Sequence, residues 1–266
     1  MRPERVVVHG LGDSLTAAIA DVWTNDRLTP WHEILADLLC LMGMDVELKS
    51  KLARVGASSR EVLTEQVLTA DIQSGDLVCL WVGGNDVLRS NYAIGDSRAA
   101  LGRVFDAVHH AGGAPLTMEL PRISDVLPGP AWAMRSWDAQ GALVNQIVKA
   151  RSHAAGGVHI RWPGPRVSGP DGTHLSQRGH YFYAEQYAIR LAERWALPVP
   201  TVEVPLGMPV FTPRDRRRWY LKHGWLWLVR RRLDNHRAQR RHRTQSGLLG
   251  AGRGKNPAPH GEARSG

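Results

Sequence analysis

The chain has 266 residues, enough for one sizeable domain with an appendage or for two small domains. Hydrophobic residues make up 43% and charged residues 22%, which excludes a mostly disordered chain, and no stretch approaches the roughly 20 apolar residues of a membrane span. The formal net charge of +9 resides in the last quarter, because residues 1–200 hold 19 basic and 21 acidic side chains whereas residues 201–266 hold 15 and 4. The near-neutral body therefore gives no sign of polyanion binding.

The N-terminus and the two cysteines bear on the compartment. Met1–Arg5 leads into a β-branched run without the apolar region or cleavage site of a secretory signal. Cys40 and Cys79 lie in apolar stretches, so we expect two buried free thiols and no disulfide framework. These features predict a cytoplasmic protein, with a peripheral membrane location as a variant.

Short β-rich runs alternate with segments of helical period through residue 197. In chain order the pattern predicts a strand over 6–8, a helix over 31–42, a strand over 45–52, a helix over 59–70, a strand over 77–82, a helix over 97–111, a strand over 115–120, a helix over 133–155, a strand over 158–162 and a helix over 176–195. Residues 16–21 begin a helix or a loop; Ser58 or Ser59 caps the second helix and Ser176 the last. This alternation predicts an α/β fold with a mostly parallel sheet between helices and with ligands beyond the carboxyl ends of its strands.

The composition of the sequence changes after the predicted domain of residues 1–197. Prolines punctuate residues 198–213, which predicts an extended linker. Residues 214–243 carry 12 lysines and arginines around an aromatic and apolar cluster, and we expect a helix there. Residues 244–266 are dominated by Gly, Pro, Ser and Arg, a composition typical of disorder.

Three interpretations of the basic segment 214–243 stay open. Its helix docks on the body through Trp225 and Trp227, or it binds an anionic membrane surface, for which Arg-rich flanks around Trp and Leu are suited. Nucleic-acid contact through the arginines of 230–232 and 240–241 ranks last, because no known reader motif accompanies them.

The first strand runs into Gly10–Thr16, whose sequence is GLGDSLT. A dinucleotide-binding turn needs a third glycine where Leu15 stands, so that function is disfavoured. A serine at the carboxyl edge of the sheet, near a helix N-terminus that favours developing negative charge, suits a nucleophile. Ser14 is therefore the candidate nucleophile.

A nucleophilic serine needs a base, a group that orients the base, and donors for an oxyanion. Asp171 and His174 share one short loop after the last strand, so the imidazole can accept the Ser14 proton while the carboxylate holds the ring. Asn85 follows the central strand and offers an amide donor. Gly56 follows the second strand, where the absence of a Cβ lets a backbone N–H approach the substrate.

Four blocks occur in order along the chain: GDS at 12–14, a glycine at 56, GGND at 83–86 and DGTH at 171–174. Over about residues 5–196 this ordered set resembles the GDSL, or SGNH, hydrolase family. The resemblance implies a three-layer α/β/α sandwich with a flavodoxin-like sheet. It also implies ester hydrolysis without a metal or an organic cofactor.

Carried over residue by residue, the resemblance assigns Ser14 as nucleophile, His174 as base and Asp171 as its partner. It assigns the oxyanion hole to the backbone amides of Ser14 and Gly56 and to the side chain of Asn85.

The sequence departs from the family pattern at two places near the pocket rim. Lys51 stands where the family often has an Asn before its glycine, and Ala17-Ala18 stand where Glu-Gly is common. Neither place is an assigned catalytic group, so both bear on the substrate more than on the mechanism.

Other residues are weaker candidates. Trp23, Trp31 and Trp81 line an acyl pocket or, as is more usual beside a buried strand, belong to the core. The His109-His110 pair and His180 lack partners at metal-ligand spacing, so we predict no metal site, and His180 is expected to be structural.

The sequence thus predicts a serine esterase or acylhydrolase that cleaves a carboxylic ester of a small molecule, lipid or acylated sugar through an acyl-enzyme on Ser14. An acyltransferase is a near variant, because an alcohol can replace water as acceptor. The alternative is a non-catalytic binding module of the same fold, directed to an anionic membrane or polyanion by its basic tail.

Overall fold

The computed structural model describes residues 3–18, 28–88, 94–127, 130–199 and 208–224. All of them belong to the first of the two units into which the chain divides, Met1–Gly224.

Five strands form one parallel sheet. They are β1 (Arg5–Gly12), β2 (Asp45–Lys51), β3 (Leu77–Trp81), β4 (Ala114–Met118) and β5 (Val158–Ile160). Their order in the sheet is β2-β1-β3-β4-β5, and every neighbouring pair is parallel. This is the flavodoxin-like order, in which the winding direction reverses between β1 and β3. Ligands of such sheets bind beyond the carboxyl ends of the strands at that switch point.

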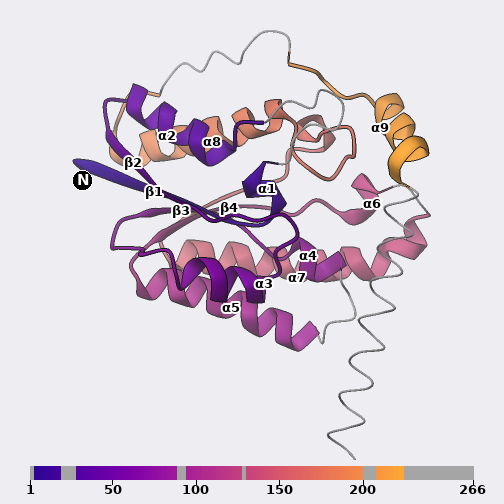
Figure 1. Ribbon diagram of the computed structural model, residues 1–266, viewed down its shortest axis with the longest axis horizontal. Helices are drawn as coiled ribbons and strands as arrows, with labels where there is room; N and C mark the ends of the chain where they lie inside the picture. Colours follow the sequence, from indigo (N-terminus) through magenta and orange to yellow (C-terminus); the bar gives the residue numbers. More distant parts are fainter. Residues whose placement is uncertain (1–2, 19–27, 89–93, 128–129, 200–207, 225–266) are drawn as a thin grey trace, which may run out of the picture. The chain divides into compact units, whose positions relative to one another are not determined.

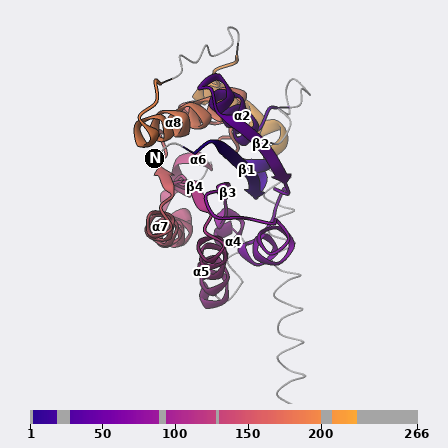
Figure 2. The same ribbon diagram turned by 90° about the vertical axis from the view of Figure 1, so that its left-hand side faces the viewer.

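Helices cover both faces of the sheet, as the alternating pattern predicts. In chain order they are α1 (Ser14–Ala17), α2 (Trp31–Leu41), α3 (Ser59–Glu61) with the π-helix Val62–Val67, α4 (Gly84–Leu88), α5 (Ile94–His110), α6 (Ile123–Val126), α7 (Ala131–Ala154), the 3-10 helix Pro165–Val167, α8 (Gln177–Trp195) and α9 (Pro213–Trp219) with the π-helical turn Tyr220–Gly224. Helices α2 and α8 pack together on one face, and α5 and α7 pack together on the other (Figures 1 and 2). The three-layer α/β/α architecture is confirmed.

Two tryptophans anchor the core on the α2–α8 side of the sheet. Trp31 is 0% exposed and stacks on Tyr187 of α8, with ring centroids 5.0 Å apart. Trp81, at the end of β3, meets Tyr183 edge-on at 6.1 Å. Both tryptophans therefore belong to the core, whereas Trp23 lies outside the described residues.

Replacing Trp31 with alanine should lower the free energy of unfolding by about 3–5 kcal/mol, because a fully buried indole and its stack on Tyr187 are lost. Urea unfolding followed by circular dichroism measures the change. Trp132, 70% exposed at the start of α7, is the matched control, and its alanine variant should stay within about 0.5 kcal/mol of the wild type. Equal losses in the two variants would contradict this assignment of the core.

Two expectations about α2 and the following helix are corrected. Cys79 is buried, but Cys40 is exposed, because it lies on α2 away from the face that buries Leu35 and Leu39. The helix expected over 59–70 is one α-helical turn that widens into a π-helix. Its cap is the first of the two predicted serines, Ser58, which forms a capping box with Glu61.

The boundary predicted at residue 213 is also corrected. Pro213 is the first residue of α9 and not the end of a linker, because Thr212 and Asp215 form a capping box that starts the helix there. Residues 225–266, with Trp225 and Trp227, lie outside the described residues, so the membrane contact and the disordered tail stay predictions. Among the described helices, none has the length and apolarity needed to cross a membrane.

Candidate active site

Ser14 begins α1 directly after β1, at the carboxyl edge of the sheet. Asp13 caps this one-turn helix: its Oδ1 accepts a hydrogen bond from Leu15 N–H at 3.0 Å, and its own N–H donates to Trp81 O at 2.9 Å. Gly12 has a φ of +120°, and a Cβ there would lie 2.1 Å from Trp81 O. Only glycine lets β1 pass this close to β3, and the close passage places Ser14 at the switch point of the sheet.

Two buried polar side chains hold the same turn, Gln66 from a distant segment and Thr16 from the turn itself. Gln66 of the π-helix accepts a hydrogen bond from Gly12 N–H at 2.6 Å and donates one to Gly12 O at 3.0 Å. Thr16 Oγ1 accepts from Trp81 N–H at 3.2 Å. Sequence reasoning missed both residues. The one signal that could have identified Gln66 is its amide side chain, which stands at a buried position with Val62, Leu63 and Val67.

The structure brings Ser14, His174 and Asp171 into one chain of contacts. His174 Nε2 lies 3.0 Å from Ser14 Oγ, and His174 Nδ1 hydrogen-bonds to Asp171 Oδ2. Asp171 Oδ1 accepts the backbone N–H groups of Thr173 and His174, both at 3.0 Å. A carboxylate can only accept, which assigns the imidazole proton to Nδ1 and leaves Nε2 to accept the Ser14 hydroxyl. The His174 side chain is 32% exposed, so a substrate can reach it.

The charges of this pair stabilise each other. Burial lowers the pKa of His174, but the charge and hydrogen bond of Asp171 and the charge of Asp13 hold that pKa above its ordinary value. Burial raises the pKa of Asp171, but the charge and hydrogen bonds of His174 and the Thr173 N–H hold that pKa below its ordinary value. The site therefore favours an imidazolium beside a carboxylate, which is the state formed when His174 takes a proton.

The Asn85 side chain lies beside Asp13 and beside the residue that follows Gly56. The Asn85 side chain, on α4, donates from Nδ2 to Ala57 O at 3.1 Å and to Asp13 Oδ2 at 3.3 Å. Ala57 directly follows Gly56, whose φ of +78° needs the conformational freedom of glycine. Burial raises the pKa of Asp13 to about 7. The two candidate oxyanion donors thus lie close together, next to a carboxyl group that titrates near neutral pH.

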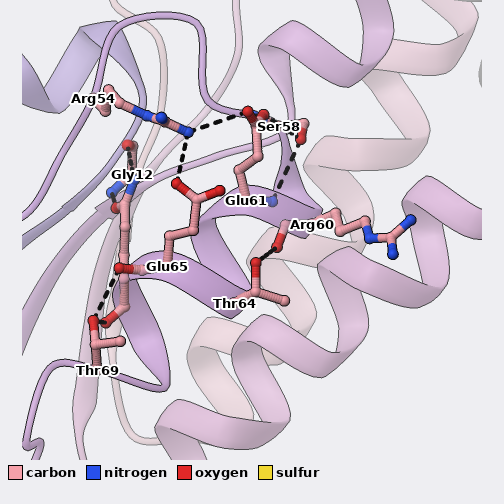
Figure 3. A network of polar contacts seen from close by, with 9 residues as sticks. Gly12, Arg54, Ser58, Arg60, Glu61, Thr64, Glu65 and Thr69 are labelled. Atoms are coloured by element: carbon pink, nitrogen blue, oxygen red, sulfur yellow. Dashed lines mark hydrogen bonds and ion pairs between the residues drawn. The ribbon is translucent and has the colours of Figure 1, made fainter.

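Arg54 anchors the loop that carries Gly56 through two ion pairs and one backbone hydrogen bond (Figure 3). The guanidinium of Arg54 lies 3.1 Å from Glu61 and 2.9 Å from Glu65, while its backbone N–H donates to Gly12 O at 3.0 Å. The loop is therefore attached both to the π-helix segment and to the strand end that precedes Ser14, which fixes where Gly56 presents its backbone.

A hollow of about 400 Å³ opens beyond the carboxyl ends of β4 and β5. Its lining is about half polar and half apolar, and the polar part includes Glu119, Arg122, Asp138, Gln146, Lys149 and His159. Leu120, also in the lining, is held by two hydrogen bonds between its backbone and the Asn145 amide, at 2.8 and 2.9 Å. A Cβ added at Gly84 would lie 3.4 Å from Leu120 Cδ2 and 3.8 Å from Asp13 Oδ2, so the first residue of α4 lies close both to Leu120 of the hollow and to Asp13.

His180, which lies on α8, has a structural role and belongs to no metal-binding cluster among the described residues. In the part of the chain that the structure describes, no three His, Cys, Asp or Glu side chains are grouped to hold a metal ion. His180 is buried, and its Nδ1 accepts the backbone N–H of Trp31 at 3.3 Å, which ties α8 to α2. Burial lowers the pKa of His180 to about 3, so it stays neutral.

Comparison with known proteins identifies a matching family and several solved structures of similar fold. The model of the GDSL-like lipase/acylhydrolase family matches residues 11–182, more than half of the chain. No curated protein matches the sequence.

Among solved structures, a lipase/acylhydrolase from Enterococcus faecalis is similar with a TM-score of 0.50 and 16% identity, over 74% of this chain and 100% of that chain. A psychrotrophic esterase, EstA, from Pseudoalteromonas sp. has a TM-score of 0.49 and 16% identity, over 73% and 99%. A family 3 carbohydrate esterase from Clostridium thermocellum has a TM-score of 0.47 and 19% identity, over 72% and 100%. At these identities, the likeness to the Enterococcus protein concerns the fold alone.

Proposed function

The chain belongs to the GDSL-like lipase/acylhydrolase family, whose members are serine hydrolases acting on esters, and we propose that it cleaves its ester through an acyl-enzyme on Ser14. The observation that carries this mechanism is the 3.0 Å contact between Ser14 Oγ and His174 Nε2, with Asp171 hydrogen-bonded to the other ring nitrogen. Family membership favours this enzyme over the non-catalytic binding module.

Acylation begins when Ser14 Oγ attacks the ester carbonyl carbon while His174 Nε2 takes the hydroxyl proton. The carbonyl oxygen becomes negative and is stabilised by the backbone N–H groups of Ser14 and Gly56 and by the Asn85 amide, which releases its 3.3 Å hydrogen bond to Asp13 Oδ2 to reach it. His174 then gives its proton to the leaving alcohol, and the acyl group stays on Ser14. Asp171 stabilises the imidazolium throughout the step.

Deacylation repeats these proton transfers with water. His174 Nε2 takes a proton from water as the water oxygen attacks the acyl carbon, and the tetrahedral intermediate collapses to release the acid and the Ser14 hydroxyl. An alcohol bound in place of water would receive the acyl group by the same route, which makes acyl transfer a side activity of the same site.

The hollow beyond β4 and β5, whose Leu120 lies close to Gly84 of α4, supports a polar alcohol moiety in the substrate. Its carboxylates, cations and amides offer hydrogen bonds to hydroxyl groups, whereas a long alkyl chain would desolvate them without replacement. Within the range of small-molecule, lipid and acylated-sugar esters, we therefore propose short acyl esters of polar alcohols such as sugars.

Replacing Asn85 with alanine should lower kcat about 10²–10³-fold with little change in KM, because an oxyanion donor acts mainly in the transition state. Steady-state hydrolysis of p-nitrophenyl acetate measures the effect. Gln140→Ala is the control, because this partly exposed amide on α7 donates only to Ser136 among the described residues, and the kcat of the variant should stay at the wild-type level. A loss below about tenfold in Asn85→Ala would remove Asn85 from the oxyanion hole.

The function itself is tested with p-nitrophenyl esters from acetate to laurate, beside an acetylated sugar and a phospholipid. The proposal predicts the highest kcat/KM for acetate or butyrate and measurable deacetylation of the sugar. An optimum at laurate would overturn the short acyl chain, and cleavage of the phospholipid alone would overturn the polar alcohol; either result would keep the esterase. No hydrolysis of any ester by folded protein would overturn the proposed function.

A further inference from the structure

The segment Thr212–Gly224 lies beyond the residues that the family model matches, yet it packs against the loop that carries Asp171. It consists of α9 and the π-helical turn after it, shown in orange in Figure 1. Sequence reasoning placed Thr212 and Pro213 in the linker and the other residues in the basic segment 214–243, and it gave none of them a part in the active site. Their contacts point to one.

Tyr220 makes the most direct of these contacts. Its hydroxyl group donates a hydrogen bond to the backbone oxygen of Asp171 at 3.1 Å and lies 3.4 Å from the backbone oxygen of Val126, the last residue of α6. The Tyr220 side chain is partly buried, and burial raises its pKa, so the hydroxyl keeps its proton and remains a donor. Tyr220 thus connects α6 to the first residue of the Asp171–His174 loop.

Arg216 holds the other side of the loop. Its Nη2 donates to the backbone oxygen of Pro165 at 2.8 Å, in the 3-10 helix before the loop. Gly172, inside the loop, has a φ of +73°, and a Cβ added there would lie 2.8 Å from Val126 O and 3.6 Å from Arg216 Cδ. The loop backbone is therefore enclosed between α6 and the stem of Arg216.

The segment is itself ordered by local features of the sequence. Thr212 and Asp215 form the capping box that starts α9, and Asp215 Oδ2 accepts both the N–H and the hydroxyl of Thr212, at 2.8 and 2.7 Å. At the far end, Gly224 is buried, and a Cβ there would lie 2.0 Å from Tyr220 Cδ1. Glycine at this position lets the tyrosine ring occupy the orientation in which its hydroxyl reaches Asp171.

We propose that Tyr220 is a positioning residue and that the segment Thr212–Gly224 completes the active site by holding the Asp171–His174 loop in register with Ser14. The inference rests on the roles proposed above for Asp171 and His174. The loop is short, and both backbone N–H groups that shape it, those of Thr173 and His174, bond to the side chain of Asp171. A displacement of Asp171 therefore moves the carboxylate, the imidazole and the Ser14 contact together.

Tyr220→Phe in the full chain tests the proposal, because it removes only the hydroxyl and keeps the ring. It should lower kcat and kcat/KM together about threefold to tenfold, with KM and the melting temperature unchanged. Gly224→Ala, which keeps the hydroxyl but displaces the ring, should give a loss at least as large. Tyr181→Phe on α8 is the control, since among the described residues none accepts a hydrogen bond from its hydroxyl, and it should behave as wild type.

Hydrogen exchange measured by mass spectrometry gives a readout that does not depend on ester hydrolysis. The amides of Thr173 and His174 should exchange about threefold to tenfold faster in Tyr220→Phe and at the wild-type rate in Tyr181→Phe. If exchange accelerates but the wild-type protein hydrolyses no ester, the positioning contact stands and the proposed function fails. Wild-type exchange in Tyr220→Phe, or a loss of kcat that merely follows a lower melting temperature, would overturn the inference.

Discussion

Ser14→Ala should lower kcat for p-nitrophenyl acetate about 10⁶-fold, because no other oxygen can form the acyl-enzyme and His174 has no partner to deprotonate. The variant should fold normally, since Ser14 caps no other group and the turn is held by Asp13, Gly12 and Gln66. Melting curves and circular dichroism check the fold, and a stopped assay with concentrated protein measures the residual rate.

The matched control for this change is Ser136→Ala. Ser136 is exposed on α7 and only accepts a hydrogen bond from Gln140 among the described residues, so its loss should leave kcat within twofold of wild type, about the scatter expected for a surface change. If Ser14→Ala kept about a hundredth of the wild-type kcat or more, a different nucleophile or a water-based mechanism would be required.

Asp171→Asn should lower kcat about 10⁴-fold while preserving the fold. The asparagine oxygen can still accept the N–H groups of Thr173 and His174, so the loop keeps its shape. Its amide nitrogen, however, would face His174 Nδ1 as a donor and force the imidazole proton onto Nε2. In that tautomer His174 cannot accept the Ser14 proton. Steady-state kinetics measure the loss.

The pH dependence gives this variant a second readout. Below its pKa, His174 is protonated and cannot accept from Ser14, so kcat/KM should fall on the acid side. In wild type the midpoint should lie above the ordinary histidine value of about 6.5, because Asp171 and Asp13 outweigh burial and hold the pKa of His174 above that value. In Asp171→Asn the residual activity should have a lower midpoint. An unchanged midpoint of the acid limb in Asp171→Asn would contradict the pairing of Asp171 with His174. Asp106→Asn, at an exposed carboxylate on α5, is the control for loss of a negative charge.

Local signals in the sequence were enough to predict the α/β/α architecture. The continuous apolar run that became β3 and the helical spacing of α2, α7 and α8 act within each segment and do not depend on distant partners. The π-helical turn at Val62–Val67 contains Gln66, which bonds to the backbone of Gly12, and no local signal in the sequence identifies that distant partner. The exposure of Cys40 likewise depends on which face of α2 meets the sheet.

The candidate site likewise contains residues whose nearness the sequence predicts and contacts that it does not predict. Ser14, Asp171, His174, Asn85 and Gly56 stand at strand ends, and parallel strands bring such positions to one edge, so their nearness could be predicted. The residues around them could not. Nothing in the sequence around Asp13 indicated its contact with Asn85, and nothing in a basic segment after a proline-rich linker indicated that Tyr220 would reach the backbone of Asp171. These contacts join segments whose packing only the folded chain defines.

The central claim is that Ser14 is a nucleophile activated by His174, and covalent labelling tests it most directly. The protein is treated with a fluorophosphonate, digested and mapped by mass spectrometry, beside Ser14→Ala and Asp171→Asn. The account predicts one adduct, on the peptide carrying Ser14, absent from Ser14→Ala and formed far more slowly in Asp171→Asn. An unlabelled Ser14 in folded, wild-type protein, or an adduct on another serine, would contradict it.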